Sequence, residues 1–97
     1  MIVINQTRIE EFALLHPDAV KALNNWLEIL KEARWTKHTD LKQAFPTADY
    51  VGNSRYVFNI RGNNYRIVVI VVFADELVSI RFIGTHQQYD RIDCKTI

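Results

Sequence analysis

The segment from Tyr56 to Asp90 constrains the fold more than any other part of the chain. Its sequence, YVFNIRGNNYRIVVIVVFADELVSIRFIGTHQQYD, is rich in β-branched and aromatic residues. Such residues favour β-strands, and two stretches that are typical of turns, Gly62-Asn63-Asn64 and Asp75-Glu76, divide the segment into three parts. The segment therefore predicts three consecutive antiparallel strands.

The lengths of the two turns decide which side chains share a face of this sheet, because side chains alternate along a strand. A two-residue loop at Asn63-Asn64 would pair Arg61 with Arg66, and a two-residue loop at Asp75-Glu76 would place Arg66 opposite Thr85. One face is then apolar and has to be covered by helices. The residues expected on it are Tyr56, Phe58, Ile60, Tyr65, Ile67, Val69, Val71, Phe73, Val78, Ile80 and Phe82. The residues expected on the other face are Arg55, Val57, Asn59, Arg61, Arg66, Val68, Ile70, Val72, Ser79, Arg81, Ile83 and Thr85.

The N-terminal half shows helical spacing, with Val20, Leu23, Leu27 and Leu30 as the clearest apolar stripe. We expect a short strand over residues 1–4 and then a first helix, begun by Asn5 or Thr7 with Glu10 at capping-box spacing. A second helix should run from Pro17 to about residues 33–35. A third, short helix should begin at Thr39 or Asp40 and be stopped by Pro46, and a loop should follow over residues 47–54. We therefore expect a single α+β domain over residues 1–97. Its N-terminal helices would pack on one face of a small antiparallel sheet, made of the three C-terminal strands and the short N-terminal strand.

The composition excludes several classes of protein. The 97 residues carry a net charge of only +1, so a polyanion would have to be bound by locally gathered basic groups. Cys94 is the only cysteine, which excludes a disulfide framework, and the three histidines have no metal-ligand spacing. We expect no metal site and no cofactor. The absence of a signal peptide and of a long apolar run favours a cytoplasmic location.

The second face is a candidate anion site. Like charges directly opposite one another destabilise a sheet, so an expected pair of Arg61 and Arg66 needs an explanation. A phosphate between the two guanidinium groups is one explanation, and the alternative is that the arginines are solvated or paired with Asp90 or Asp93. Lys37, His38 and Lys42 could extend a phosphate-binding rim, although solvated charges are the better explanation. Trp26 and Trp35 are candidate base-stacking platforms, although the helical spacing of Trp26 favours the core.

His86 and Tyr89 follow the third strand and supply groups for proton transfer. His is the usual acid or base near neutral pH, and nearby arginines would lower the pKa of Tyr89. Cleavage of RNA without a metal needs a base for the 2′-OH, cations for the phosphate and an acid for the leaving 5′-oxygen. Each residue also has an ordinary structural explanation: His86 as a surface residue, Tyr89 as packing under the C-terminus.

The hairpin YVFNIRGNNYRIVV and the ending IRFIGTHQQYDRI resemble the HigB-type toxins of type II toxin–antitoxin modules, a branch of the RelE-like mRNA interferases. The resemblance implies a RelE-like fold and a ribosome-dependent endoribonuclease that cuts translated mRNA in the A site. It also implies a helix-turn-helix antitoxin of the HigA type, through which alone the toxin would contact operator DNA. By position, Arg66 and Arg81 would bind the phosphate, and His86 or Tyr89 would be the base.

Supporting RNA contacts are expected from Arg61, Asn59, Lys37 and Lys42. The strand that carries Asn59 and Arg61 has lysines in the best-studied branch, which leaves the general base open. Two alternatives remain: a non-catalytic protein-binding module, or a toxin of the same fold with a different target.

Overall fold

The computed structural model describes residues 1–97, and its centre is a five-stranded sheet. The strands are β1 (Ile2–Ile4), β2 (Asp49–Gly52), β3 (Arg55–Ile60), β4 (Tyr65–Val72) and β5 (Leu77–Thr85). Their order in the sheet is β1-β5-β4-β3-β2, and all neighbours are antiparallel except β1, which runs parallel to β5. The three C-terminal strands and the N-terminal strand are confirmed. The sheet is mixed rather than antiparallel, and β2 is an additional strand where a loop was expected.

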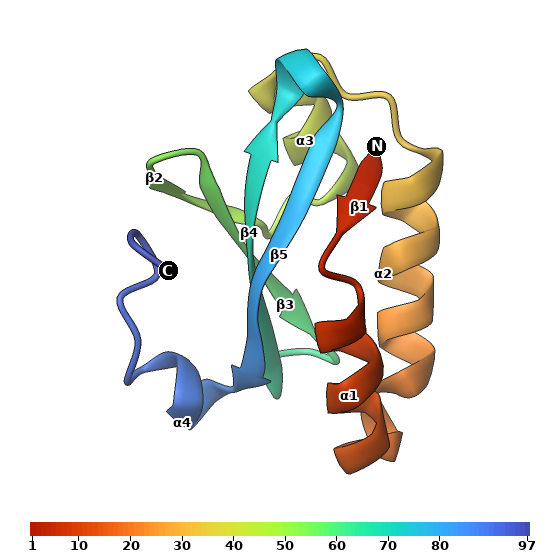
Figure 1. The fold of residues 1–97 in the computed structure, drawn as a ribbon, viewed down its shortest axis with the longest axis vertical. Helices are drawn as coiled ribbons and strands as arrows, with labels where there is room; N and C mark the ends of the chain where they lie inside the picture. Colours follow the sequence, from red (N-terminus) through yellow and green to blue (C-terminus); the bar gives the residue numbers. More distant parts are fainter.

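Helices cover one face of the sheet, which we call the helix face (Figure 1). They are α1 (Thr7–Leu15), α2 (Val20–Glu32) and α3 (His38–Ala44), and a 3₁₀ helix (Pro17–Ala19) leads into α2. The expected capping box at the start of α1 is absent, because Thr7 already lies inside the helix and Gln6 precedes it. The helix α2 ends at Glu32 because the backbone of Ala33 is extended. None of the helices has both the length and the apolar character that a membrane span requires.

The hydrophobic core lies between these helices and the sheet and contains one cluster of 19 buried residues. The stripe of α2 supplies Leu23, Leu27 and Leu30 to it. Trp26 and Trp35 are also part of the cluster, with exposed fractions of 2% and 5%. Neither tryptophan is therefore available as a base-stacking platform.

The turn between β3 and β4 contains four residues, 61–64, instead of two. Ile60 pairs with Tyr65 and Asn59 with Arg66, so the predicted pairing of Arg61 with Arg66 is wrong. Arg61 itself lies in the turn with a φ of 51°. The predicted face of Arg66 is nevertheless correct, because two extra residues in a loop leave the alternation of faces unchanged.

The turn between β4 and β5 also contains four residues, and Val72 rather than Ala74 pairs with Leu77. A β-bulge follows: Val69 pairs with Ile80, but Val68 pairs with Phe82. Arg81 is therefore the additional residue of the bulge, and the strand changes phase at this point.

The bulge exchanges the faces of the last part of β5. Arg66 pairs with Gly84, and Phe82 shares the face of Arg66, whereas Ile83 packs against the core. Thr85 pairs with Tyr65, which belongs to the helix face. The predicted faces of Phe82, Ile83 and Thr85 are thus wrong. The prediction assumed regular alternation along this strand, and no residue pattern in the sequence indicates the bulge.

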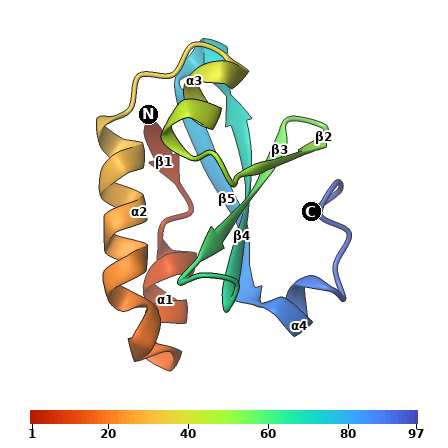
Figure 2. The ribbon, with the colours of Figure 1, turned by 180° about the vertical axis from the view of Figure 1, so that it is seen from behind.

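The opposite face of the sheet, which we call the arginine face, is covered differently. The short helix α4 (His86–Tyr89) and the C-terminal segment (residues 90–97) lie on this side, across the sheet from α1 and α2 (Figures 1 and 2). Val57 and Val68 pair with each other on this face and are 3% and 0% exposed, although neither belongs to the core cluster. The arginine face therefore has a small buried patch of its own.

Candidate active site

A capping box sets the position of α4 directly after β5. The hydroxyl of Thr85 accepts a hydrogen bond from the backbone N–H of Gln88 at 3.2 Å, and the side chain of Gln88 accepts one from the backbone N–H of Thr85 at 2.9 Å. These bonds satisfy N–H groups that the first turn of a helix leaves free. They fix the direction in which His86 and Tyr89 leave the strand.

Gly84 allows α4 to fold closely against β5. A Cβ atom at this position would lie 2.6 Å from the side-chain oxygen of Gln88 and 2.6 Å from the ring of Phe82. Gly84 is also the residue that pairs with Arg66. The absence of a side chain at Gly84 therefore allows α4 to lie against the end of β5, beside Arg66 near the start of β4 (Figure 1).

Arg66 contacts both candidate catalytic side chains of α4. Its Nη2 atom lies 3.0 Å from Nε2 of His86, and its guanidinium carbon lies 4.7 Å from the centre of the Tyr89 ring. The second ring nitrogen of His86, Nδ1, lies 3.3 Å from a carboxylate oxygen of Asp90. Three of the residues predicted for catalysis thus form one continuous cluster, and Asp90 extends it.

Two further predicted residues lie on the same face. Asn59 pairs with Arg66 across β3 and β4, and Arg81 lies at the bulge of β5. The Nε atoms of Arg66 and Arg81 are buried and have no hydrogen-bond partner within the protein. Buried donors usually have an acceptor, so these two Nε atoms are unsatisfied by the groups of the free protein.

The environment of Tyr89 differs from the expectation. Burial, together with the neighbouring Cys94 thiol, raises the pKa of Tyr89 to about 12, and the opposing effect of Arg66 is smaller. The predicted lowering of this pKa by arginines is wrong, because desolvation of the phenolate outweighs the nearby positive charge. At neutral pH Tyr89 is a phenol that can donate a proton.

The C-terminal segment is tied across the arginine face. The guanidinium of Arg55 donates to the carbonyl oxygen of Ile97 from Nε at 3.0 Å and from Nη2 at 2.7 Å. Asn53 donates to the carbonyl oxygen of Lys95 at 3.1 Å. Both contacts join residues 42 positions apart in the sequence, so no local pattern could have revealed them.

Arg61 does not join the cluster. Its Nη1 lies 2.9 Å from a carboxylate oxygen of Asp18, which also accepts a hydrogen bond from the Tyr65 hydroxyl at 2.6 Å. The Tyr65 hydrogen bond and the charge of Arg61 hold the pKa of Asp18 below its usual value. Arg61 therefore joins the β3–β4 turn to the 3₁₀ helix before α2 instead of facing Arg66.

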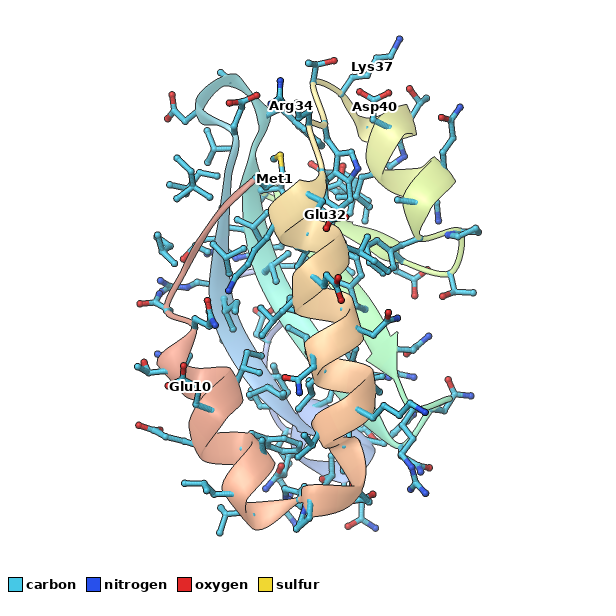
Figure 3. All side chains as sticks on the ribbon, turned by 90° about the vertical axis from the view of Figure 1, so that its right-hand side faces the viewer. Met1, Glu10, Glu32, Arg34, Lys37 and Asp40 are labelled. Atoms are coloured by element: carbon cyan, nitrogen blue, oxygen red, sulfur yellow. The ribbon has the colours of Figure 1, made fainter.

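The predicted basic rim is also separate from the cluster. Lys42 donates to the backbone carbonyls of Pro46 and Ala48, so its ammonium group stabilises the connection between α3 and β2. His38 is hydrogen bonded to the hydroxyl of Tyr56, a residue of the helix face, at 2.7 Å. Lys37 extends into solvent at the start of α3, at the end of the molecule opposite α4 (Figures 1 and 3).

The arrangement provides an arginine, an imidazole and a protonated phenol within one cluster, and Arg81 is a second arginine on the same face of the sheet. These are the groups that acid–base cleavage of a phosphodiester requires. No set of three or more His, Cys, Asp or Glu side chains lies close enough together to hold a metal ion.

A sheet with helices on one face and this cluster on the other is consistent with the class of RelE-like toxins. Residues 19–92 match the family model HigB_toxin, described as the RelE-like toxic component of a toxin–antitoxin system. The chain belongs to this HigB toxin family, which confirms the resemblance of the hairpin and of the C-terminal motif. Membership implies that an antitoxin is its partner.

Two relatives support this assignment over most of the chain. An mRNA interferase HigB of Escherichia coli is 28% identical over 94 residues, which cover 95% of this chain and 91% of that protein. An mRNA interferase HigB of Shigella flexneri is 31% identical over 93 residues, which cover 93% of this chain and 88% of that protein. The similarity thus includes both the helical layer and the sheet.

Proposed function

We propose that this toxin is an endoribonuclease that cleaves mRNA on the translating ribosome. Membership of the HigB family and the mRNA interferase activity named for its relatives support the enzyme class. The observation that carries the proposal in this chain is the contact of Arg66 with both His86 and Tyr89. It brings a phosphate-binding group next to two groups that can transfer protons.

In this proposal Arg66 and Arg81 bind the phosphate to be cleaved. Guanidinium groups match phosphate oxygens through paired N–H donors, and both Nε atoms lack an acceptor in the protein. The same charges stabilise the negative charge that grows on the phosphate oxygens in the transition state. Asn59, opposite Arg66, adds a neutral donor to the RNA-binding surface.

His86 and Tyr89 divide the two proton transfers. His86 accepts the proton of the ribose 2′-OH while the 2′-oxygen forms a bond to phosphorus. The bond from phosphorus to the 5′-oxygen breaks, and the leaving oxygen takes the proton of the Tyr89 hydroxyl. The raised pKa of Tyr89 suits an acid rather than a base, so the base is assigned to His86. The products are a 2′,3′-cyclic phosphate and a 5′-hydroxyl, and no metal is needed.

The remaining parts of the proposal concern partners and location. The antitoxin would be a helix-turn-helix protein of the HigA type, and the toxin would contact operator DNA only through it. The mRNA would be presented in the ribosomal A site, which explains how a chain with a net charge of +1 can act on RNA. Residues 1–97 would act in the cytoplasm as one domain.

Primer extension on mRNA from cells that produce the protein tests the function. The wild type should arrest growth and create new cleavage ends in translated mRNA, and Arg66→Ala or His86→Ala should abolish both without unfolding the protein. Arg34→Ala is the matched control, because Arg34 is exposed beyond α2, away from α4 (Figures 1 and 3). Growth arrest without new ends would favour a toxin with another target, and neither effect would favour a binding module.

A further inference from the structure

The two partners of the His86 imidazole impose the same protonation state on it. Arg66 approaches Nε2 at 3.0 Å with a group that can only donate, so Nε2 must accept. Asp90 approaches Nδ1 at 3.3 Å with an ionised carboxylate, which can only accept, so Nδ1 must carry the proton. Hydrogens are assigned from such networks: both contacts place a proton on Nδ1, and the Arg66 contact in addition selects the neutral ring.

We propose that Asp90 is a positioning residue that holds His86 in the Nδ1–H tautomer, so that Nε2 is the atom that accepts the proton of the 2′-OH. This inference rests on the proposed function and deepens it, because it assigns the base to one atom and gives Asp90 a role. Asp90 acts only through His86. It does not touch the RNA.

The same geometry describes how the base becomes available. In the free protein Nη2 of Arg66 donates to the lone pair of Nε2, so the base is occupied. A phosphate oxygen is a stronger acceptor for a guanidinium than a neutral imidazole nitrogen. When a substrate phosphate takes this donor, the Asp90 contact keeps the proton on Nδ1 and leaves the lone pair of Nε2 free for the 2′-OH.

A merely structural role for Asp90 is a poor explanation of the contact. The side chains of His86 and Asp90 are 47% and 61% exposed, and exposed ion pairs contribute little to stability. The helix α4 is already fixed by its own capping box and by its close approach to Gly84. Removing the carboxylate should therefore alter the chemistry of His86 and leave the fold unchanged.

The experiment compares Asp90→Ala, Asp90→Asn and the wild type, with Asp75→Asn as a control at an exposed aspartate in the turn before β5. Nitrogen-15 NMR of the His86 ring reports the tautomer directly, and it is recorded in an Arg66→Ala background so that Asp90 is the only partner of the ring that differs between the variants. Single-turnover cleavage on ribosomes programmed with mRNA gives the rate constant at saturation and the concentration for half-maximal rate. Thermal unfolding reports the fold.

In an Arg66→Ala background, where Asp90 is the remaining partner of the ring, we expect Asp90→Ala to move the proton of His86 towards Nε2. In the otherwise wild-type protein Asp90→Ala should lower the saturated rate constant about tenfold or more, with the half-saturating concentration unchanged. Asp90→Asn should restore the tautomer and most of the rate, because the amide oxygen can still accept from Nδ1–H. Asp75→Asn should change nothing. Retention of the Nδ1–H tautomer by Asp90→Ala in the Arg66→Ala background, or a wild-type rate constant for Asp90→Ala alone, overturns the proposal.

The two measurements separate this inference from the proposed function. A wild-type protein that cuts no mRNA overturns the proposed function and with it the catalytic part of the inference. The NMR result still decides by itself whether Asp90 sets the tautomer.

Discussion

The two faces of the sheet are covered in different ways. On the helix face three helices bury a cluster of 19 residues, and the cover is made of regular elements with apolar stripes. On the arginine face a helix of four residues and an irregular segment are held by a few directed contacts: the capping box of Thr85, the stacking of Arg66 on Tyr89 and the hydrogen bonds of Arg55 to Ile97.

The difference separates stability from chemistry. Burial of apolar area provides most of the free energy of folding, and the helix face contains most of it. Polar groups that must meet a substrate cannot be buried in such a core without cost. Each face can therefore be changed with a different consequence, and the following predictions test this separation in order of decreasing effect.

The largest expected effect is on the helix face. Leu30→Ala removes a side chain that is fully buried in α2 and should lower the free energy of unfolding by about 4 kcal/mol, from lost transfer energy and the cavity left behind. Leu14→Ala, at a position that is 82% exposed on α1, is the matched control and should change it by less than about 0.5 kcal/mol. Urea denaturation measures both, and equal midpoints would contradict the importance assigned to the α2 stripe.

The second effect concerns the titration of Tyr89. The titration of Tyr89 is obtained by following phenolate absorbance against pH in the wild type and subtracting the curve of Tyr89→Phe. The difference should have its midpoint near pH 12, because burial and Cys94 raise the pKa of Tyr89. The unfolded chain releases this proton near pH 10, so the contribution of Tyr89 to stability is constant below pH 10 and is lost as the pH rises to about 12. A midpoint near pH 10 would restore Tyr89 as a candidate base.

Two neighbouring valines provide a matched comparison of the faces. Val69 on the helix face and Val68 on the arginine face are both 0% exposed. Val69→Ala should cost about 2 kcal/mol, from the lost methyl groups and the cavity. Val68→Ala should cost less, since the irregular C-terminal segment can settle into the space more easily than a helix can. Equal losses in urea denaturation would show that the two covers are equally rigid.

The smallest effect is expected from the tie of the C-terminal segment. Arg55→Ala removes the hydrogen bonds to Ile97 and should cost about 1 kcal/mol. Amide hydrogen exchange should become faster in residues 90–97 and remain unchanged in α2. Arg91→Ala is the control, because this exposed arginine makes no side-chain hydrogen bond in the structure. Unchanged exchange in Arg55→Ala would mean that other contacts hold the segment.

The sequence predicted the parts of the fold that depend on local pattern. Strand propensity located β3, β4 and β5, and helical spacing located α2. The face of Arg66 was predicted correctly because the β3–β4 turn has an even number of residues, although it has four residues and not the predicted two. The capping box at Thr85 and Gln88 could also have been found, since its spacing is the same as that of Thr7 and Glu10, where it was expected and is absent.

The other features depend on contacts between distant residues. The edge strand β2 has only four residues, and its pairing with β3 rather than its own composition defines it. Asp18 and Arg61 are 43 positions apart, and Arg55 and Ile97 are 42 apart. The pKa of Tyr89 was misjudged for the same reason: the charges near it were visible in the sequence, and its burial was not.

The parallel pairing of β1 with β5 has a consequence for the order of synthesis. Ile2 and Val3 leave the ribosome before the other strands, but their partners Leu77 and Val78 emerge only after β2, β3 and β4. The helix that carries His86 and Tyr89 follows later still. Arg66 consequently meets these side chains only when the whole sheet is available, so a nascent or truncated chain that lacks residues 77–89 has no assembled cluster.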